Sequence, residues 1–217
     1  MMMRYLISFA VYAIAATPVL AQSNISEISQ VSVGNSSLID QTRAVSSEVS
    51  IDQIGRDNVA DVADQGTNSF LIIEQSGTRQ SALVQLDGSG NQGDVIQDGA
   101  GNTADISVVG TLNNFRLSQS AAELLIGSRG NTAALEQAGT GNTAFQTQLG
   151  ADNAMLLSQN GADNYADLLQ NGDRNSMQLE QSGDNNSAEL KQFGSEATPI
   201  VVTQIGGMSV QITQTGE

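Results

Sequence analysis

"NYADLLQNGDRNSMQLEQSGDNNSAEL", residues 164–190, repeats one pattern every eleven residues: a Gln, a Gly two positions later and an Asn three positions after the Gly. Helices do not require glycine at this spacing, and a catalytic site needs its residues only once. The pattern therefore indicates a repeated structural unit.

The pattern extends through most of the chain when each glycine is counted as position zero. Glycine recurs every eleven residues in two runs, at Gly55, Gly66, Gly77, Gly88, Gly99 and Gly110, and at Gly139, Gly150, Gly161, Gly172, Gly183 and Gly194. The asparagines of position three are Asn58, Asn91, Asn102, Asn113, Asn142, Asn153, Asn164, Asn175 and Asn186, with Asn131 in the same series. The glutamines of position nine are Gln75, Gln97, Gln119, Gln148, Gln159, Gln170, Gln181 and Gln192, with Gln137 in the same series.

The residues between these markers alternate in polarity. Position seven is aliphatic in nearly every copy, with Gln146 as the exception. Positions three, five, seven and nine carry almost no charge, while the positions between them hold charges such as Asp61 and Glu74. This period of two predicts that each unit is a β-strand of about seven residues and a turn of about four, in which Gly, Asp and Asn supply the backbone angles.

Position five reveals a longer period of 22 residues. Alanine alternates there with a different residue, in the order Ala60, Leu71, Ala82, Gly93, Ala104, Phe115, and later Ala144, Met155, Ala166, Met177, Ala188, Pro199. Two unlike strands therefore form one coil, with a small side chain facing a large one across a thin interior. The sequence predicts an all-β fold, a single β-solenoid of stacked two-strand coils over residues 22–217.

Stacking gives the repeated residues a structural role. Identical side chains would lie about 4.8 Å apart, so the Asn and Gln amides can form ladders from coil to coil while the glycines turn the chain. The 22-residue stacking also predicts that Asp94 lies beside Arg116, and that Asp167 lies beside Glu189. Two carboxylates this close should raise the pKa of Asp167 or of Glu189, or of both.

Two places break the pattern. Residues 121–127, "AAELLIG", supply seven residues where eleven belong, which predicts a truncated half-coil and a ladder break that separates two stacks. Asp64 is the only charged residue at an inward position between Gly55 and Pro199. We interpret it as an irregularity of the fold or as a gatekeeper against aggregation.

Composition excludes most enzyme classes. The chain contains no Cys and no His, which excludes disulfides, Cys/His zinc sites, thiol nucleophiles and His-based catalysis. The acidic residues are scattered along outward positions without loops that could form a groove, which argues against a polysaccharide lyase or hydrolase. We predict no catalytic residue, no metal site and no cofactor.

The first 21 residues differ from the rest. Arg4 precedes the apolar run "YLISFAVYAIAA", and small residues follow up to Ala21, which predicts a cleaved secretory signal peptide rather than a membrane anchor. Without Arg4, seven basic residues remain against 23 acidic ones, a net charge of −16. Nucleic acid and anionic membranes are therefore poor partners, and no membrane insertion is expected.

The formula Q-x-G-x-x-N-x-A-x-x-x-Q, in "QNGADNYADLLQ" and "QSGDNNSAELKQ", resembles the curlin repeat of curli subunits, the amyloid fibre proteins of Gram-negative bacteria. The resemblance implies a protomer that adds end to end into extracellular fibres for biofilm matrix and surface adhesion. It also implies a nucleator, an outer-membrane secretion apparatus, and contact with extracellular matrix or host surfaces. The chain departs from the family in holding about eight or nine coils and in lacking the leading Ser of many copies.

Several alternatives remain open. The chain could be the major fibre subunit, a nucleator or minor subunit, or a solitary secreted solenoid that binds a partner without polymerising. A calcium-binding solenoid would need the G-G-x-G-x-D repeat, and an ice-binding one a flat column of outward Thr pairs; neither pattern is present. A disordered Gln/Asn-rich linker would not keep a constant eleven-residue frame.

Overall fold

The computed structural model describes residues 23–121 and 129–216, where every regular element is a β-strand. One set of strands is β1 (Ile25–Val31), β3 (Glu48–Arg56), β5 (Phe70–Thr78), β7 (Gln92–Ala100), β9 (Asn114–Ala121), β11 (Thr143–Leu149), β13 (Tyr165–Asn171), β15 (Ser187–Phe193) and β17 (Ser209–Thr215). The other set is β2 (Ser36–Asp40), β4 (Val59–Asp64), β6 (Ser81–Ser89), β8 (Thr103–Thr111), β10 (Thr132–Thr140), β12 (Ala154–Ala162), β14 (Ser176–Ser182) and β16 (Ile200–Ile205).

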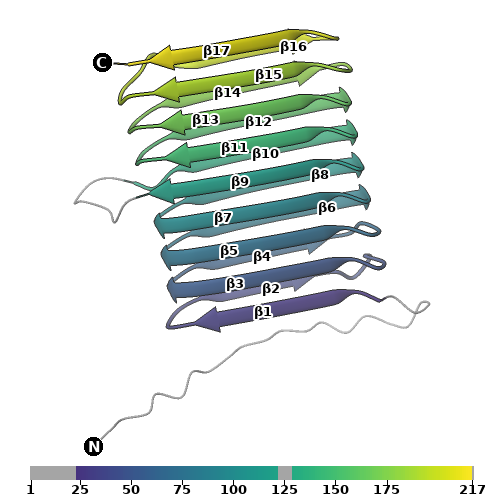
Figure 1. Ribbon diagram of the computed structural model, residues 1–217. Coiled ribbons are helices and arrows are strands. Elements are labelled where there is room, and N and C mark those ends of the chain that lie inside the picture. Colours follow the sequence, from purple (N-terminus) through teal and green to yellow (C-terminus); the bar gives the residue numbers. More distant parts are fainter. Residues whose placement is uncertain (1–22, 122–128, 217) are drawn as a thin grey trace, which may run out of the picture.

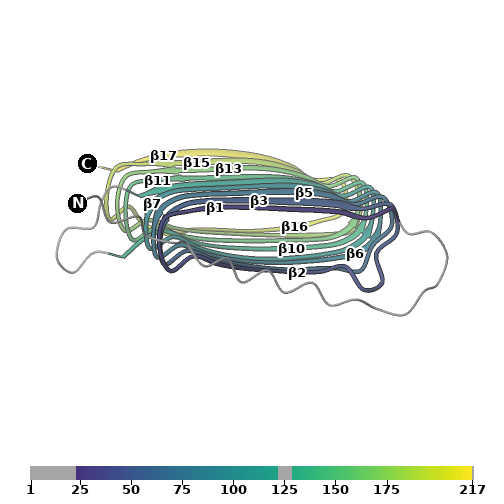
Figure 2. The ribbon, with the colours of Figure 1, turned by 90° about the horizontal axis from the view of Figure 1, so that it is seen from below.

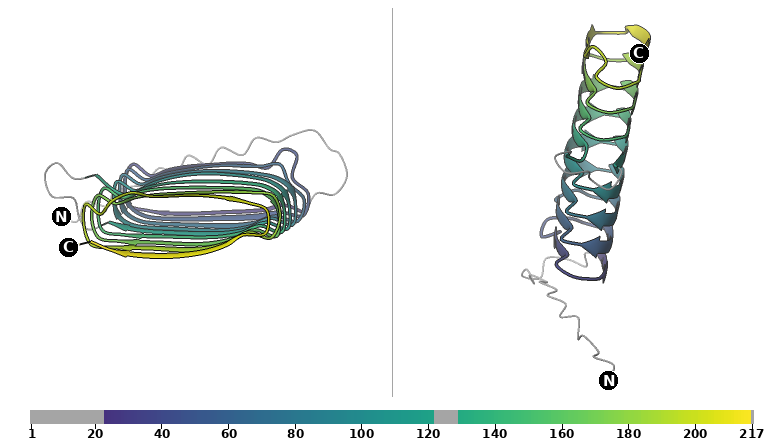
Figure 3. Two further views of the ribbon diagram at one scale, coloured as in Figure 1. Left: turned by 90° about the horizontal axis from the view of Figure 1, so that it is seen from above. Right: turned by 90° about the vertical axis from the view of Figure 1, so that its left-hand side faces the viewer.

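These strands form two parallel sheets that face each other. The odd-numbered strands make a nine-stranded sheet and the even-numbered strands an eight-stranded sheet, each in sequence order (Figure 1). The chain alternates between the sheets, so each odd strand and the even strand after it form one coil of a flattened spiral (Figures 2 and 3). The predicted all-β solenoid is confirmed. It has eight complete coils and one further strand, β17, which is the ninth strand of its sheet.

The register confirms the 22-residue coil. Gln53 lies beside Gln75 and Gln75 beside Gln97, which is the offset found between most neighbouring strands. The offset grows to 23 residues where β1 pairs with β3, β2 with β4 and β14 with β16. It grows to 29 residues where β8 pairs with β10 and β9 with β11.

The predicted break in the stack is wrong. Residues 122–128 lie outside the described residues, as does the predicted signal peptide at 1–21. However, β9 pairs with both β7 and β11, and β10 pairs with both β8 and β12. The seven additional residues therefore lie in the connection between β9 and β10 and leave both sheets continuous, because strand pairing depends on the register of the strands and tolerates a longer connection.

The longer turn changes which sheet carries the large residues of position five. Before it, the odd strands carry the larger side chains, such as Leu71 and Phe115, with Gly93 in β7 as the exception, and β4, β6 and β8 carry alanine. After it, alanine belongs to the odd strands and the even strands carry Met155 and Met177. The expected alternation along the chain is therefore interrupted, since Ala133 and Ala144 occupy this position in successive strands.

Pro199 does not occupy position five as the sequence predicts. Ile200 pairs with Met177 and is buried, while Pro199 lies exposed before β16. The connection between β15 and β16 holds one residue more than the 22-residue coil requires, which moves the proline out of the strand. Proline lacks the N–H that a ladder hydrogen bond requires, so this placement costs the sheet no hydrogen bond.

Positions five and seven fill the narrow interior between the sheets. The largest fully buried side chains include Phe115, Leu117, Leu157, Leu168 and Leu190. Phe115 fits because its neighbour in β7 is Gly93, where a Cβ atom would lie 2.1 Å from the Phe115 ring.

Candidate functional site

The glutamines of the nine-stranded sheet form one unbroken ladder. Each Nε2 donates to the Oε1 of the glutamine one coil further along, at 2.6 to 3.2 Å. The members are Gln30, Gln53, Gln75, Gln97, Gln119, Gln148, Gln170, Gln192 and Gln214. The ladder has a direction, because every donor points toward the C-terminal end of the solenoid.

Most ladder glutamines also connect the two sheets. Gln75 Nε2 donates to the Val59 carbonyl at the start of β4, at 2.9 Å, and Gln97 makes the equivalent bond to Ser81 in β6, at 3.0 Å. Both donors of the amide group are thereby used inside the protein. These bonds satisfy a buried polar group and hold the sheets together at one edge of the interior.

The eight-stranded sheet contains a shorter glutamine ladder. It runs through Gln137, Gln159, Gln181 and Gln204, with donor–acceptor distances of 2.7 to 2.9 Å. Earlier positions of the same column hold Asp64, Leu86 and Val108. Gln137 Oε1 is consequently buried without a hydrogen-bond partner, because its neighbour on that side is a valine.

The asparagines of position three connect each turn to the turn of the next coil. Asn164 Oδ1 accepts from the backbone N–H of Asn186 at 3.0 Å, and its Nδ2 donates to the Gly183 carbonyl at 2.8 Å. Asn142 stands in the same relation to Asn164 and Gly161. Each asparagine therefore fixes the position of the turn stacked on it, which explains why Asn follows Gly at a constant spacing.

The structure places all ten predicted asparagines and all nine predicted glutamines in the interior, each no more than 2% exposed. Sequence reasoning missed other members of the same columns, namely Asn24, Asn35, Ser47, Ser69, Gln30, Gln53, Gln80, Gln204 and Gln214. Gln53 was missed because no glycine lies nine residues before it, although a glycine two residues after it was a usable signal.

Eleven of the twelve predicted turn glycines have positive φ, and Gly66 is the exception. Their main constraint is the next coil, since a Cβ atom on Gly77 would lie 1.9 Å from the Gly99 carbonyl oxygen. A second left-handed residue lies two positions after the glycine and is usually not glycine, as at Asp57, with φ of 57°.

Asp64 occupies an inward position as predicted and is completely buried. Its Oδ1 accepts from the Gly66 N–H at 3.0 Å and its Oδ2 accepts from Gln41 Nε2 at 3.3 Å. The carboxylate thus replaces an amide in the glutamine column and is held by neutral donors. A role as a gatekeeper stays a prediction.

The outward charges follow the stacking register. Arg116 Nε lies 3.3 Å from Asp94 Oδ2, which confirms the predicted pair. Asp167 lies beside Glu189, also as predicted. The expected rise in pKa is wrong for Glu189, because Lys191 pairs with it and a hydrogen bond from Lys191 holds the Glu189 pKa below its usual value.

Both ends of the solenoid are open sheet edges. At the first end β1 and β2 each pair on one side, and at the last end β16 and β17 do the same. Apolar inward residues are only partly covered there: Ile28 and Ile39 at the first end, and Val202, Val210 and Ile212 at the last. These ends expose unpaired backbone donors and acceptors beside apolar surface.

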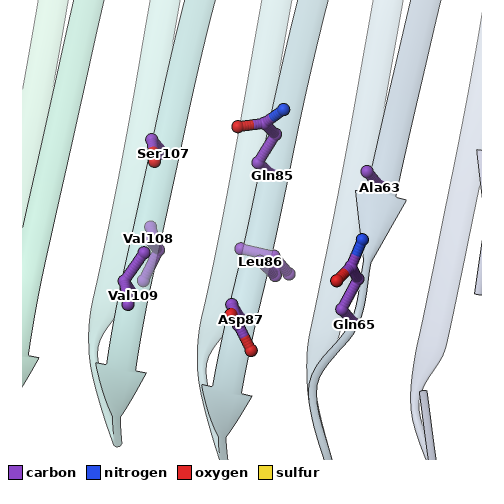
Figure 4. Close-up of a pocket in the computed structure, with 8 residues that line it drawn as sticks. All are labelled: Ala63, Gln65, Gln85, Leu86, Asp87, Ser107, Val108 and Val109. Carbon is purple, nitrogen blue, oxygen red and sulfur yellow. The ribbon is translucent and has the colours of Figure 1, made fainter. Parts of the chain in front are cut away.

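A hollow on the outer side of β4, β6 and β8 is lined by Ala63, Gln65, Gln85, Leu86, Asp87, Ser107, Val108 and Val109 (Figure 4). Its one titratable side chain, Asp87, provides no pair for acid–base catalysis. Over residues 23–121 and 129–216 there is no cluster of three acidic side chains able to hold a metal ion, and no helix long and apolar enough to cross a membrane.

Comparison with known proteins identifies the repeat. No curated protein matches the chain significantly. Residues 46–77, which span β3 to β5, and residues 161–194, which span β13 to β15, match the family described as curlin associated repeat. In both segments the matched residues include the Gln and Gly columns described above, and these two parts of the chain are therefore curlin associated repeats.

Proposed function

We propose that this protein is a secreted, curli-type fibre subunit whose copies add end to end. The observation that carries the proposal is the pair of open ends, where unpaired parallel strands flank half-covered apolar side chains. Adding a strand to such an edge satisfies its backbone groups and covers the apolar residues in one step. Because the two ends differ, contact between them is heterologous and generates an open filament.

The direction of the long glutamine ladder supports this growth. Gln214 Oε1 accepts from Gln192, and Gln214 Nε2 donates to no further glutamine of the described residues, while Gln30 Oε1 lies at the first end of the ladder. A second copy placed on the last coil would receive the donor that the ladder presents there. Joining like ends would place two donors or two acceptors together, so the ladder favours one polarity of the fibre.

The remaining parts of the proposal come from the family. Curlin-repeat proteins are secreted extracellular components of curli, so we place this chain at the cell surface, in biofilm matrix and adhesion. Its partners would be further copies, a nucleator and an outer-membrane secretion apparatus. A role as the nucleator itself would replace the major-subunit role if the chain seeded another subunit more strongly than itself.

The test is to follow thioflavin fluorescence of the exported, purified protein at neutral pH. We expect a lag that preformed fibres abolish, and fibres that diffract at about 4.8 and 10 Å. Protein that stays monomeric, or that forms only amorphous precipitate, would contradict the proposal and favour a solitary solenoid.

A further inference from the structure

The described solenoid contains an odd number of strands, which constrains how two copies can join. It begins with β1 and ends with β17, and both belong to the nine-stranded sheet. Figure 1 shows that β1 starts at one edge of the solenoid while β17 ends at the opposite edge. The next position along the spiral after β17 therefore lies in the eight-stranded sheet, on top of β16.

Two copies stacked in the same orientation cannot fill that position. If β1 of the second copy pairs with β17, then β2 of the second copy lies two strand spacings from β16, about 9.6 Å. One strand position is then vacant, and the edge of β16 remains unpaired beside buried residues. Unpaired buried backbone groups are costly, so this joint loses much of the gain of stacking.

We propose that successive copies are related by a half turn about the fibre axis, so that β1 of one copy adds to β16 of the preceding copy and β2 adds to β17. This inference rests on the proposed fibre function. A half turn exchanges the two sheets and reverses the strand direction, so every new pair is parallel, as all pairs within the chain are.

The residues at the joint match in this arrangement. Every strand carries the same inward order, so Gln204 meets Gln30 of the next copy, and Gln214 meets Gln41. Gln41 already donates to Asp64 in the direction of the ladder. The long glutamine ladder therefore continues through the joint, from the nine-stranded sheet of the first copy to the eight-stranded sheet of the second. Gln204 Nε2 donates to the Ser187 and Met208 carbonyls, so the shorter ladder continues to Gln30 when Gln204 exchanges its bond to Met208 for one across the joint.

The outward residues also favour the half turn. Ile205 is 72% exposed at the end of β16, and Val31 is 52% exposed at the corresponding position of β1. The half turn places these two aliphatic side chains beside each other. Stacking without rotation would instead place Val31 beside Thr215 and leave Ile205 next to the vacant position. The half turn brings no like charges together, because the outward positions of β16 and β17 are uncharged.

The geometry can be tested by disulfide formation, since the chain contains no cysteine. Ser29, Thr203 and Thr213 occupy the same outward register position in β1, β16 and β17, and Asp40 occupies it in β2. The half turn puts Ser29 beside Thr203, and Asp40 beside Thr213, at one strand spacing of about 4.8 Å, which a disulfide spans.

Fibres of the double variants Ser29→Cys/Thr203→Cys and Asp40→Cys/Thr213→Cys should therefore lose their monomer band to multimers on a non-reducing gel after oxidation by copper phenanthroline. The matched control Ser29→Cys/Thr213→Cys should remain monomeric on the same gel, because its cysteines are not neighbours in this joint. Linkage of the control pair, or of none of the pairs in well-formed fibres, would overturn the half turn and leave the fibre proposal standing. If the unmodified protein forms no fibres, the fibre proposal fails, and the half turn fails with it.

Discussion

Gln119 donates to Gln148 at 2.9 Å although 29 residues separate them, as closely as Gln97 donates to Gln119 across 22 residues. The longer connection between β9 and β10 therefore leaves the amide ladder intact. A continuous ladder ties each glutamine to a neighbour on both sides, so the loss of one member affects two others.

Gln148→Leu should destabilise the protein by about 2–4 kcal/mol. It removes the acceptor of Gln119 Nε2 and the donor to Gln170 Oε1, and each buried group left without its partner costs about 1–3 kcal/mol. Urea unfolding of the freshly prepared monomer, followed by far-ultraviolet circular dichroism, measures the change.

Two matched variants test the cause. Gln137→Leu should cost less than Gln148→Leu, because Gln137 Oε1 already lacks a partner and only the bond to Gln159 Oε1 is lost on the ladder. Gln178→Leu, on the outer face of β14, should change stability by no more than about 0.5 kcal/mol. Equal losses for all three would show that the ladder contributes nothing.

Gly77→Ala should destabilise the solenoid by about 3 kcal/mol or more. The new methyl group would lie 1.9 Å from the Gly99 carbonyl oxygen, and φ of 121° strains any residue with a side chain. Gly206→Ala is the control, since nothing lies within 4 Å of its Cβ and only the left-handed backbone, about 1–2 kcal/mol, opposes it. The same unfolding assay should separate them, and similar losses would mean that the approach of the next coil is unimportant.

The sequence predicts the repeat well because equivalent positions of successive coils need the same types of residue. Residues equivalent to Asn164 and Gln170 return in most coils for the same reason, which is a bond to the coil beside them. The strand period, the coil length and the inward columns are therefore visible without a structure. Asp64 was recognisable as inward because it breaks a column that is otherwise uncharged.

Features that depend on a single place in the chain were not predictable. The seven residues 121–127 predict a broken stack, because the sequence does not reveal that a connection can lengthen while the strands on both sides keep pairing. The pairing of Lys191 with Glu189 was missed for a related reason. The 22-residue register relates residues in neighbouring coils, whereas Lys191 and Glu189 are neighbours on one strand.

Gly93→Ala should cost about 1–3 kcal/mol through overpacking alone. Its backbone has no positive φ, but the new Cβ would lie 2.1 Å from Cζ of Phe115. Phe115→Leu removes that contact, so the double variant Gly93→Ala/Phe115→Leu should be more stable than the sum of the single losses implies. A double-mutant cycle of unfolding free energies measures the coupling. Strictly additive losses would contradict the packing of Phe115 against Gly93.

Lys191→Gln should raise the pKa of Glu189. The hydrogen bond and charge of Lys191 hold this pKa below its usual value, and Asp167 lies on the neighbouring strand. A lowered folded pKa contributes stability that is present above the unfolded pKa and is lost as pH falls through the folded value. The variant should therefore be less stable than the unmodified protein at pH 7, and the difference should disappear as the pH falls below the folded pKa of Glu189. Carboxyl carbon shifts in a pH titration of the monomer report the pKa, and an unchanged value would contradict the pairing.

Asp167→Asn and Asp94→Asn make the same change in net charge but alter different contacts. Asp167 lies beside Glu189, and like charges opposed on a sheet cost about 0.2–1 kcal/mol, less where Lys191 and salt screen them. Asp94 instead pairs with Arg116 at the surface, where such pairs contribute about 0–1 kcal/mol.

We expect Asp167→Asn to shorten the lag of fibre growth at pH 7 and Asp94→Asn to leave it unchanged or lengthen it, with thioflavin fluorescence as the measurement. Raising the salt concentration should reduce the difference between the two variants. Equal acceleration by both would mean that only the total negative charge of the protein opposes assembly, and that the stacked charge columns do not.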